Sequence, residues 1–186
     1  GTDTQLSDVS NKGNAVSAVK LSEDKVFIAH SYDSNYFLYG VVCTINETTI
    51  TAGTNTALNN SSAGAGSHIS AVALSNNKVF IAHSYGTSNV WLYGLVCTID
   101  GTTITKGNDT ELITDNYSGK AISAVALSEN KVFIAHQYGG YYRLYGIICT
   151  IDNNTITKGS DTAIATGSYG AGDVISAVAL NENKVF

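Results

Sequence analysis

The tripeptide Lys-Val-Phe occurs four times at a constant interval of 53 residues, starting at Lys25, Lys78, Lys131 and Lys184. Self-similarity at a fixed period of this size indicates that one supersecondary unit is stacked repeatedly. The repeat therefore constrains the architecture of this chain more strongly than any other feature, whereas it says little about chemistry.

Each repeat contains four short segments, which in the third repeat are residues 122–127, 131–136, 144–151 and 155–157. They are rich in Val, Ile, Thr, Tyr and Phe and are bounded by Asn, Asp, Gly and Ser, which is typical of β-strands. No stretch shows the helical period over about ten or more positions. We expect each repeat to be a four-stranded antiparallel meander.

Both faces of the third segment are apolar. In the first repeat Tyr39, Val41 and Cys43 alternate with Leu38 and Val42. A sheet with two apolar faces must be covered on both sides, and a radial array of blades achieves this. We therefore expect an all-β fold, a β-propeller of four-stranded antiparallel blades, with a linear stack of β-sheets as the alternative.

The alignment of the repeats gives the expected blade boundaries. Residues 1–6 align with residues 107–112, so the chain opens in the tail of a preceding blade. The expected division is a tail at 1–13, blade 1 at 14–58, blade 2 with its leading loop at 59–112, blade 3 at 113–164 and a partial blade 4 at 165–186. Propellers have about four to eight blades. We therefore expect either a piece of a longer array, which the absence of Met also suits, or association with other copies.

Composition argues against several classes of function. The formal net charge is -5 and the 10 Lys and Arg residues are scattered over the repeats, so we expect no nucleic-acid partner. No apolar run approaches the roughly 18 residues of a membrane span, so we expect no membrane insertion. Motifs such as Gly-x-Ser-x-Gly do not occur, and nearly every polar residue recurs in each repeat. We expect a protein that is not an enzyme and has no cofactor.

Cysteine and histidine also recur with the repeat. The cysteines are Cys43, Cys97 and Cys149, all in the third segment. We expect them to be small buried apolar residues, the usual state of free cysteine. The repeated histidines are His30, His83 and His136. We expect them to be partly buried and bonded to neighbouring backbone, because matching points of adjacent blades are too far apart to share a zinc ion. His68 has no counterpart and is expected in a loop.

The connections between the second and third segments, and those between repeats, vary in length and content, whereas the remaining turns hardly vary. In an antiparallel meander both variable sets emerge at the same end. They are rich in Tyr, Ser, Gly and Asn, which form adaptable recognition surfaces. The candidate ligand-binding residues are Tyr36, Phe37, Asn89, Trp91, Tyr117, Tyr141, Tyr142, Arg143 and Tyr169.

Packing is the alternative explanation for some aromatic residues at this end. Six tyrosines recur from repeat to repeat and are expected to pack with their hydroxyls at the rim. They are Tyr32, Tyr39, Tyr85, Tyr93, Tyr138 and Tyr145. The position shared by Phe37, Trp91 and Arg143 changes chemistry, which favours a role in specificity, although a contact between blades would also tolerate Phe and Trp.

The four segments of the third repeat, at 122–127, 131–136, 144–151 and 155–157, resemble tandem repeats of tail and tail-fibre-like proteins of phages and prophages from Gram-positive bacteria. They resemble more loosely the blades of bacterial surface β-propellers. The resemblance covers all repeats and implies a location on a virion or cell surface and a role in host attachment, but it assigns no site residues.

Together these observations lead us to expect a non-enzymatic module for surface or host attachment that binds glycans through its variable aromatic loops. A structural spacer or assembly element of a virion or cell-surface fibre, joined to further repeats or other copies, is the alternative.

Overall fold

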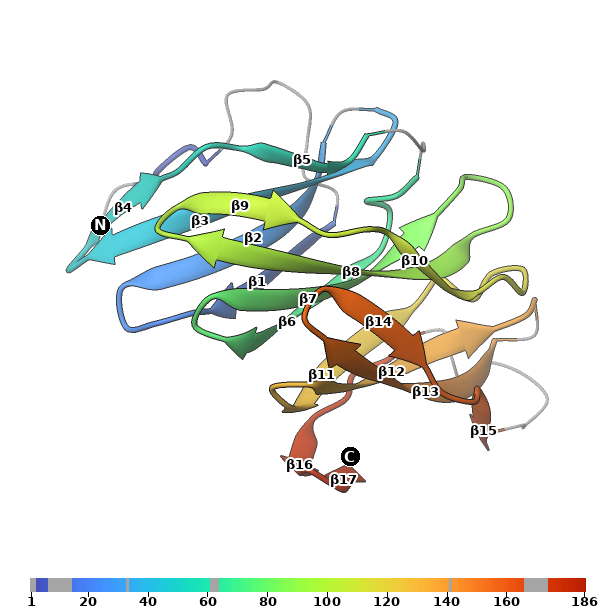
Figure 1. Ribbon diagram of the computed structural model, residues 1–186. Coiled ribbons are helices and arrows are strands. Elements are labelled where there is room, and N and C mark those ends of the chain that lie inside the picture. The colour runs from blue at the N-terminus through green and yellow to red at the C-terminus, as the bar shows by residue number, and fades with distance from the viewer. Residues whose placement is uncertain (1–2, 7–14, 33, 61–63, 141, 166–173) are drawn as a thin grey trace.

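The computed structural model describes residues 3–6, 15–32, 34–60, 64–140, 142–165 and 174–186. Within these ranges the chain forms strands and no helix, so the expected all-β class is confirmed. The strands form three five-stranded antiparallel sheets followed by a two-stranded hairpin. Figure 1 shows them in chain order, from the N-terminal sheet in blue to the hairpin in red.

The three sheets repeat one plan, and we call them units 1, 2 and 3. Unit 1 consists of β1 (Val16–Lys20), β2 (Lys25–Tyr32), β3 (Phe37–Asn46), β4 (Thr49–Ala52) and β5 (Thr56–Asn59). Unit 2 consists of β6 (Ile69–Ser75), β7 (Lys78–Tyr85), β8 (Trp91–Asp100), β9 (Thr103–Lys106) and β10 (Thr110–Ile113). Unit 3 consists of β11 (Ile122–Ser128), β12 (Lys131–Tyr138), β13 (Arg143–Asp152), β14 (Thr155–Lys158) and β15 (Thr162–Ala165). The hairpin consists of β16 (Ala179–Asn181) and β17 (Lys184–Val185).

The four-stranded meander was only partly correct, because the outermost position of each sheet is split between two short strands. In unit 1, β4 pairs with residues 43–46 of β3, and β5 pairs with residues 38–40 of the same strand. The interruption lies at Gly53, whose N–H donates to the Val42 carbonyl at 2.9 Å. A side chain at Gly53 would place its Cβ only 2.8 Å from that carbonyl oxygen, so the close approach requires glycine. Gly107 and Gly159 make the same backbone bond in the next two units.

The added strands β5, β10 and β15 end at Asn59, Ile113 and Ala165, within one residue of the expected blade ends at 58, 112 and 164. The segment 107–112, to which residues 1–6 align, contains most of β10. In the described part of the expected tail at 1–13, Gln5 and Leu6 line a hollow together with Tyr39 and residues 53–55 of unit 1.

The apolar core lies between units. One cluster joins Phe27, Leu38 and Leu58 of unit 1 to Ile81 and Ile104 of unit 2. A second cluster joins the equivalent residues of units 2 and 3, with Phe80, Leu92 and Leu112 on one side and Ile134 and Ile156 on the other. Unit 2 therefore has one apolar face covered by unit 1 and the other by unit 3, as the two apolar faces of the third segment predicted.

We call the face that packs on the following unit the forward face and the other the rear face. The forward face of unit 1 comprises Leu21, Phe27, Ala29, Leu38, Val42 and Leu58, and the rear face of unit 2 comprises Ala71, Val79, Ile81, Leu95, Cys97, Ile99 and Ile104.

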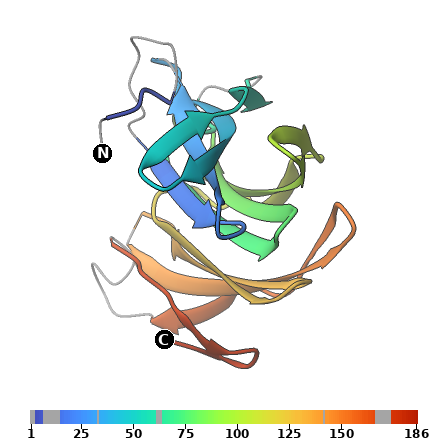
Figure 2. The ribbon, with the colours of Figure 1, turned by 90° about the vertical axis from the view of Figure 1, so that its left-hand side faces the viewer.

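The first strands of successive units lie next to one another. β1 contacts β6, β6 contacts β11, and β11 contacts β16. The backbone N–H of Ala71 donates to Ser17 Oγ at 2.9 Å, and Ala124 and Ala177 make the same bond to Ser70 and Ser123. In Figure 2 the units follow one another from the blue sheet to the red hairpin. The small Ser and Ala residues of these strands allow this close approach.

Candidate functional site

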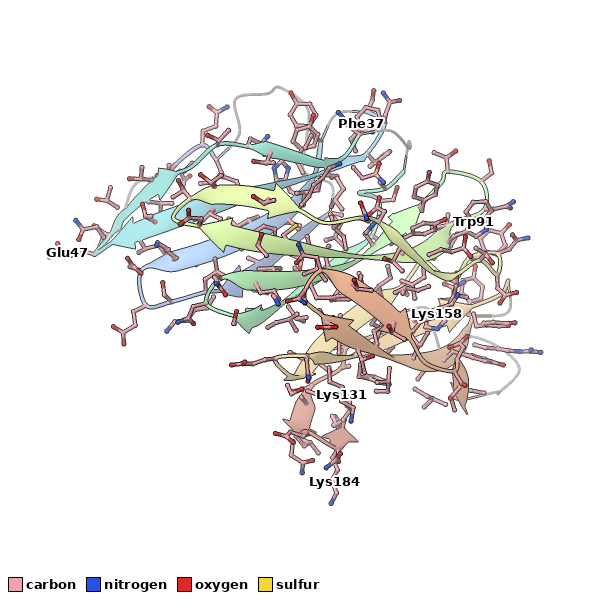
Figure 3. All side chains as sticks on the ribbon, in the orientation of Figure 1. Phe37, Glu47, Trp91, Lys131, Lys158 and Lys184 are labelled. Atoms are coloured by element: carbon pink, nitrogen blue, oxygen red, sulfur yellow. The ribbon has the colours of Figure 1, made fainter. Side chains whose placement is uncertain are left out.

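The short turns and the variable connections lie at opposite ends of the sheets. Figure 3 shows Phe37 and Trp91 at one end, whereas Glu47, in the turn between β3 and β4, lies at the far tip. We call the first end the loop end. Its described residues are 34–36, 86–90, 139–140 and 142 between paired strands, together with 60, 64–68 and 114–121 between units.

The segments between units bind the neighbouring loops through their backbone. Gly64 N–H donates to the Asn35 carbonyl at 2.7 Å, and Gly66 N–H donates to the Tyr36 carbonyl at 2.5 Å. Gly119 N–H donates to the Val90 carbonyl at 2.9 Å. A Cβ on Gly119 would lie 2.2 Å from the Trp91 carbonyl oxygen, so no side chain fits there. The loop end is therefore one continuous, closely packed surface that spans the three units.

Three of the candidate tyrosines have unusual backbone geometry. Tyr36, Tyr117 and Tyr142 have φ angles of 56°, 69° and 55°, in the left-handed region that bulky residues seldom adopt. Tyr142 is 39% exposed, whereas Tyr36 and Tyr117 are half-buried. Lys120 Nζ lies 4.2 Å from the centre of the Tyr117 ring, a cation–π contact. Left-handed backbone at such residues costs about 1–3 kcal/mol each and is concentrated at functional sites.

The remaining candidates occupy two kinds of position. Asn89 is exposed in the loop between β7 and β8. Phe37, Trp91 and Arg143 are half-buried and open β3, β8 and β13. Their strand partners are Tyr32, Tyr85 and Tyr138. Tyr141 and Tyr169 lie outside the described residues.

Trp91 packs as well as facing the loop end. Its ring lies parallel to that of Tyr85, with the centroids 6.3 Å apart and the planes 11° apart. Its Nε1 is buried and has no hydrogen-bond acceptor among the residues that the structure describes. Trp91 therefore has a packing contact within its own unit.

The recurring tyrosines are packing residues, as expected. Tyr32 stacks on Tyr39 with centroids 4.3 Å apart, and Tyr85 stacks on Tyr93 at 4.4 Å. The third pair, in unit 3, stacks at 4.2 Å. Each unit therefore carries one stacked tyrosine pair between its second and third strands.

The repeated histidines bond to neighbouring backbone, as predicted, but they are buried rather than partly buried. They also bind a partner that the sequence reasoning missed. His83 Nδ1 lies 2.7 Å from the Ser84 carbonyl, and its Nε2 lies 3.0 Å from Asp109 Oδ1. His136 makes the equivalent contact to Asp161 at 2.9 Å, and His30 makes it to Asn55 at 2.9 Å. The histidines therefore fasten the segment before β5, β10 or β15 to the second strand, which is a structural role.

A signal for these partners is present in the sequence. The pattern Gly-x-Asn/Asp-Thr recurs at residues 53–56, 107–110 and 159–162. Asn59 Nδ2 of unit 1 also donates to Asp109 Oδ2 of unit 2, so the network crosses between units.

The starts of β1, β6 and β11, together with residues 174–175, line one hollow at the loop end, of about 510 Å³. Its lining includes Val16, His68, Ile122 and Val174, which are spaced along the chain within one residue of the 53-residue repeat. His68 precedes β6, as expected of a loop residue, and its backbone N–H donates to Ser84 Oγ at 3.1 Å. Burial, and secondarily the nearby positive charge of Lys120, lowers the pKa of His68 below its usual value.

The cysteines are buried as predicted. Burial raises the pKa of Cys97 and of Cys149 to about 12, so both thiols stay protonated at neutral pH. This environment is the opposite of the one that activates a nucleophilic cysteine.

Comparison of the chain with protein-family models, with curated proteins and with solved structures gives no match. Across the ranges that the structure describes, three or more His, Cys, Asp or Glu side chains nowhere gather in a group that could hold a metal ion. A membrane-spanning helix is likewise not found among the described residues.

Proposed function

We propose that this protein is a non-enzymatic repeat module of the β-propeller type that attaches to a surface by binding glycans at its loop end. The observation that carries the proposal is the left-handed backbone of Tyr36, Tyr117 and Tyr142, all at the same end of the molecule. Because this geometry is costly for tyrosine, a functional role for the side chains is the reason we infer for its presence.

The arrangement of the first strands supports a radial rather than a linear array. Contacts between successive units include those of β1 with β6 and of β6 with β11. The starts of β6 and β11, and residues 15–16 and 174–175 of the flanking repeats, line the same hollow. Strands that converge in this way are expected near the axis of a propeller, whereas a linear stack would keep all strands equally spaced.

The chemistry of the loop end suits sugar rings. Tyrosine offers a flat apolar face together with a hydroxyl, and Asn89 offers an amide donor and acceptor. Sugars present C–H groups on one face and hydroxyls at the edge, so aromatic stacking and amide hydrogen bonds would act together. The backbone bonds made by Gly64, Gly66 and Gly119 hold the loops in place, which lowers the entropy lost on binding.

Attachment to a host or cell surface is the role that we propose for this binding, with the protein on a virion or at the cell surface. Many weak sugar contacts distributed over repeated units would provide avidity. Neither catalysis nor a cofactor is needed for this role.

A glycan array with the purified chain tests the proposal. Tyr142→Ala and Asn89→Ala remove exposed loop-end groups, and Trp91→Ala removes the aromatic ring at the position that varies between units. Glu47→Ala is the matched control, because Glu47 is exposed at the opposite end. Binding by the wild type and by the control, with loss of at least tenfold in Tyr142→Ala, would support the proposal.

Absence of glycan binding by the wild type would contradict the proposal and favour a spacer or assembly element. Equal binding by the wild type and Tyr142→Ala would reject the loop end as the site. Thermal unfolding of each variant controls for loss of structure, which matters most for the half-buried Trp91.

A further inference from the structure

The buried histidine of unit 2 lies between oxygen atoms on both sides of its ring. His83 Nδ1 lies 2.7 Å from the Ser84 carbonyl oxygen and 3.2 Å from that of Ala65. Its Nε2 lies 3.0 Å from Asp109 Oδ1. Carbonyl and carboxylate oxygens only accept hydrogen bonds. Both ring nitrogens of His83 therefore have to donate, and an imidazole ring with two N–H groups carries a positive charge.

The histidine of unit 3 has the same surroundings. His136 Nδ1 lies 2.8 Å from the Gln137 carbonyl oxygen, and its Nε2 lies 2.9 Å from Asp161 Oδ1. The other carboxylate oxygen, Asp161 Oδ2, is buried and has no hydrogen-bond partner among the residues that the structure describes. A buried carboxylate is stable only beside a positive charge, which the ring of His136 supplies.

Unit 1 provides a contrast within the same chain. His30 Nδ1 lies 2.9 Å from the Ser31 carbonyl oxygen, but its Nε2 lies 2.9 Å from the side-chain amide of Asn55. An amide can turn its NH₂ group toward a ring nitrogen and donate to it. A neutral imidazole therefore satisfies every contact in unit 1, whereas units 2 and 3 need one more proton.

This additional proton belongs on the ring. Free carboxyl groups of aspartate and free imidazole lose their protons at about pH 3.9 and 6.5, so imidazole holds a proton more firmly. The side chains of His83 and His136 are fully buried. Loss of the proton would leave a ring nitrogen lone pair facing an oxygen atom where water does not reach, and a hydrogen bond would become a repulsive contact.

We propose that His83 with Asp109, and His136 with Asp161, are proton-dependent clamps that are closed while the ring is charged and weaken as pH rises. Each clamp fastens the segment before β10 or β15 to the second strand of its unit. The unfolded chain gives up the histidine protons near pH 6.5, whereas the closed clamp keeps its proton. Unfolding therefore releases protons above this pH, and stability falls as pH rises.

The clamp of unit 2 also reaches the neighbouring unit and the loop end. Asp109 Oδ2 accepts a hydrogen bond from Asn59 of unit 1. Ala65, whose carbonyl faces the ring of His83, lies between Gly64 and Gly66, and the N–H groups of these glycines hold the loop that contains Tyr36. Opening of this clamp would loosen the joint between units 1 and 2 and the loop end together. This inference does not depend on what the loop end binds.

Other titratable groups surround the clamps. Those near Asp109 are Tyr93, Cys97, Lys106 and Glu111, those near the clamp of unit 3 are Tyr138 and Tyr145, and Cys149 and Lys158 occupy the positions equivalent to Cys97 and Lys106. Tyrosine, lysine and carboxyl groups ordinarily titrate outside pH 6.5–7.5, and thiols lie mostly above it. Burial lowers the pKa of His68, which gives a pH dependence of the opposite sign and of less than about twofold over this range.

Nitrogen NMR of the imidazole rings tests the charge directly. At pH 7.5 the spectrum of the folded protein should show protons on both ring nitrogens of His83 and of His136, but on only one nitrogen of His30. Asp109→Asn and Asp161→Asn assign the two signals, because each variant should convert one ring to the state with a single proton. A single protonated nitrogen on His83 or His136 in the wild type at this pH would overturn the proposal.

Urea unfolding at pH 6.5 and 7.5 tests the effect on stability. Each clamp should lower the equilibrium constant for folding about fivefold over this interval, so the constant of the wild type should fall at least tenfold. The fall should be smaller in Asp109→Asn and in Asp161→Asn and absent in the double variant. These variants should fold, because Asn55 occupies the same place in unit 1.

Asp100→Asn removes the same charge from an exposed turn and should behave like the wild type. A wild type whose stability does not fall between the two pH values, or a double variant that keeps the fall of the wild type, would each contradict the clamps.

Discussion

Leu112 and Ile164 occupy the same repeat position in different surroundings, and comparing them measures how much stability comes from contacts between units. Leu112 is fully buried beneath the rear face of unit 3, whereas Ile164 is 53% exposed on the forward face of unit 3. Both residues lie in the short strand that pairs with the start of the third strand of their unit. Their local strand environment is therefore matched, and the covering unit is the main difference.

We expect Leu112→Ala to lower the free energy of unfolding by about 3–4 kcal/mol, because a fully buried leucine is replaced and a cavity remains. Full burial of an aliphatic side chain contributes about 1.5–3 kcal/mol. Ile164 is only about half-buried, so Ile164→Ala should cost about 1 kcal/mol. The expected difference between the two variants is about 2 kcal/mol or more.

Urea denaturation followed by tryptophan fluorescence measures this difference. Trp91 is the single tryptophan of the chain, and it precedes Leu92, which belongs to the same apolar cluster as Leu112. With a slope of about 2 kcal/mol per M, the midpoint for Leu112→Ala should fall by about 1.5–2 M. The slopes of the three proteins should agree, since a changed slope indicates a changed unfolding mechanism. Equal losses in the two variants would refute the reasoning that the core lies between the units.

Three further predictions follow from the contacts between loops, the histidine network and the buried thiols. Gly119→Ala should destabilise the protein by about 2 kcal/mol or more in thermal or urea unfolding, because its Cβ would meet the Trp91 carbonyl oxygen, whereas Gly101→Asn should be nearly neutral because Asn153 already holds that turn position at a φ of 54°. A stable Gly119→Ala would contradict the close packing of the loop end. Asp109→Ala should lower the free energy of unfolding in urea by about 2–4 kcal/mol, because it removes the hydrogen bonds to His83 and Asn59. Asp109→Asn should retain most of the stability, because Asn55 occupies the equivalent place in unit 1. Equal losses in the two variants would contradict the claim that a side chain of the same shape preserves these bonds. Cys97 and Cys149 should resist alkylation at pH 8 and react on unfolding. Because their pKa of about 12 exceeds the value of about 8.5 for an unfolded thiol, the free energy of unfolding should decline as pH rises from about 9 to 12. Rapid labelling of either thiol in the native protein would contradict this assignment.

The sequence predicted the repeated part of the structure well, because the 53-residue interval and the two apolar faces of each sheet both indicate sheets that pack against one another. Lys25, Lys78 and Lys131 each begin the second strand of a unit, and each sheet is covered on both faces where a neighbour exists. The split outer strand was missed. The four residues of β10 are separated from β9 by Gly107, Asn108 and Asp109, which have turn preferences, and only tertiary pairing with β8 makes them a strand.

The candidate site was predicted in location more than in geometry. The variation between repeats identified the loop end, but no sequence pattern predicts left-handed backbone at Tyr36 or Tyr142, because tyrosine disfavours it. The partners of His83 and His136 follow 26 and 25 residues later in the chain, so periodicity within one strand could not reveal them. Comparison of the Gly-x-Asn/Asp-Thr pattern among repeats would have identified these partners.

Methyl and aromatic NOEs across the two internal interfaces test the central claim most directly. The structure predicts NOEs from the forward face of unit 1, including Phe27 and Leu58, to the rear face of unit 2, including Ile81 and Ile104. The equivalent set should appear from Phe80 and Leu112 of unit 2 to residues of unit 3. A spectrum in which these side chains show NOEs only within their own sheet would contradict the stacking of forward on rear faces.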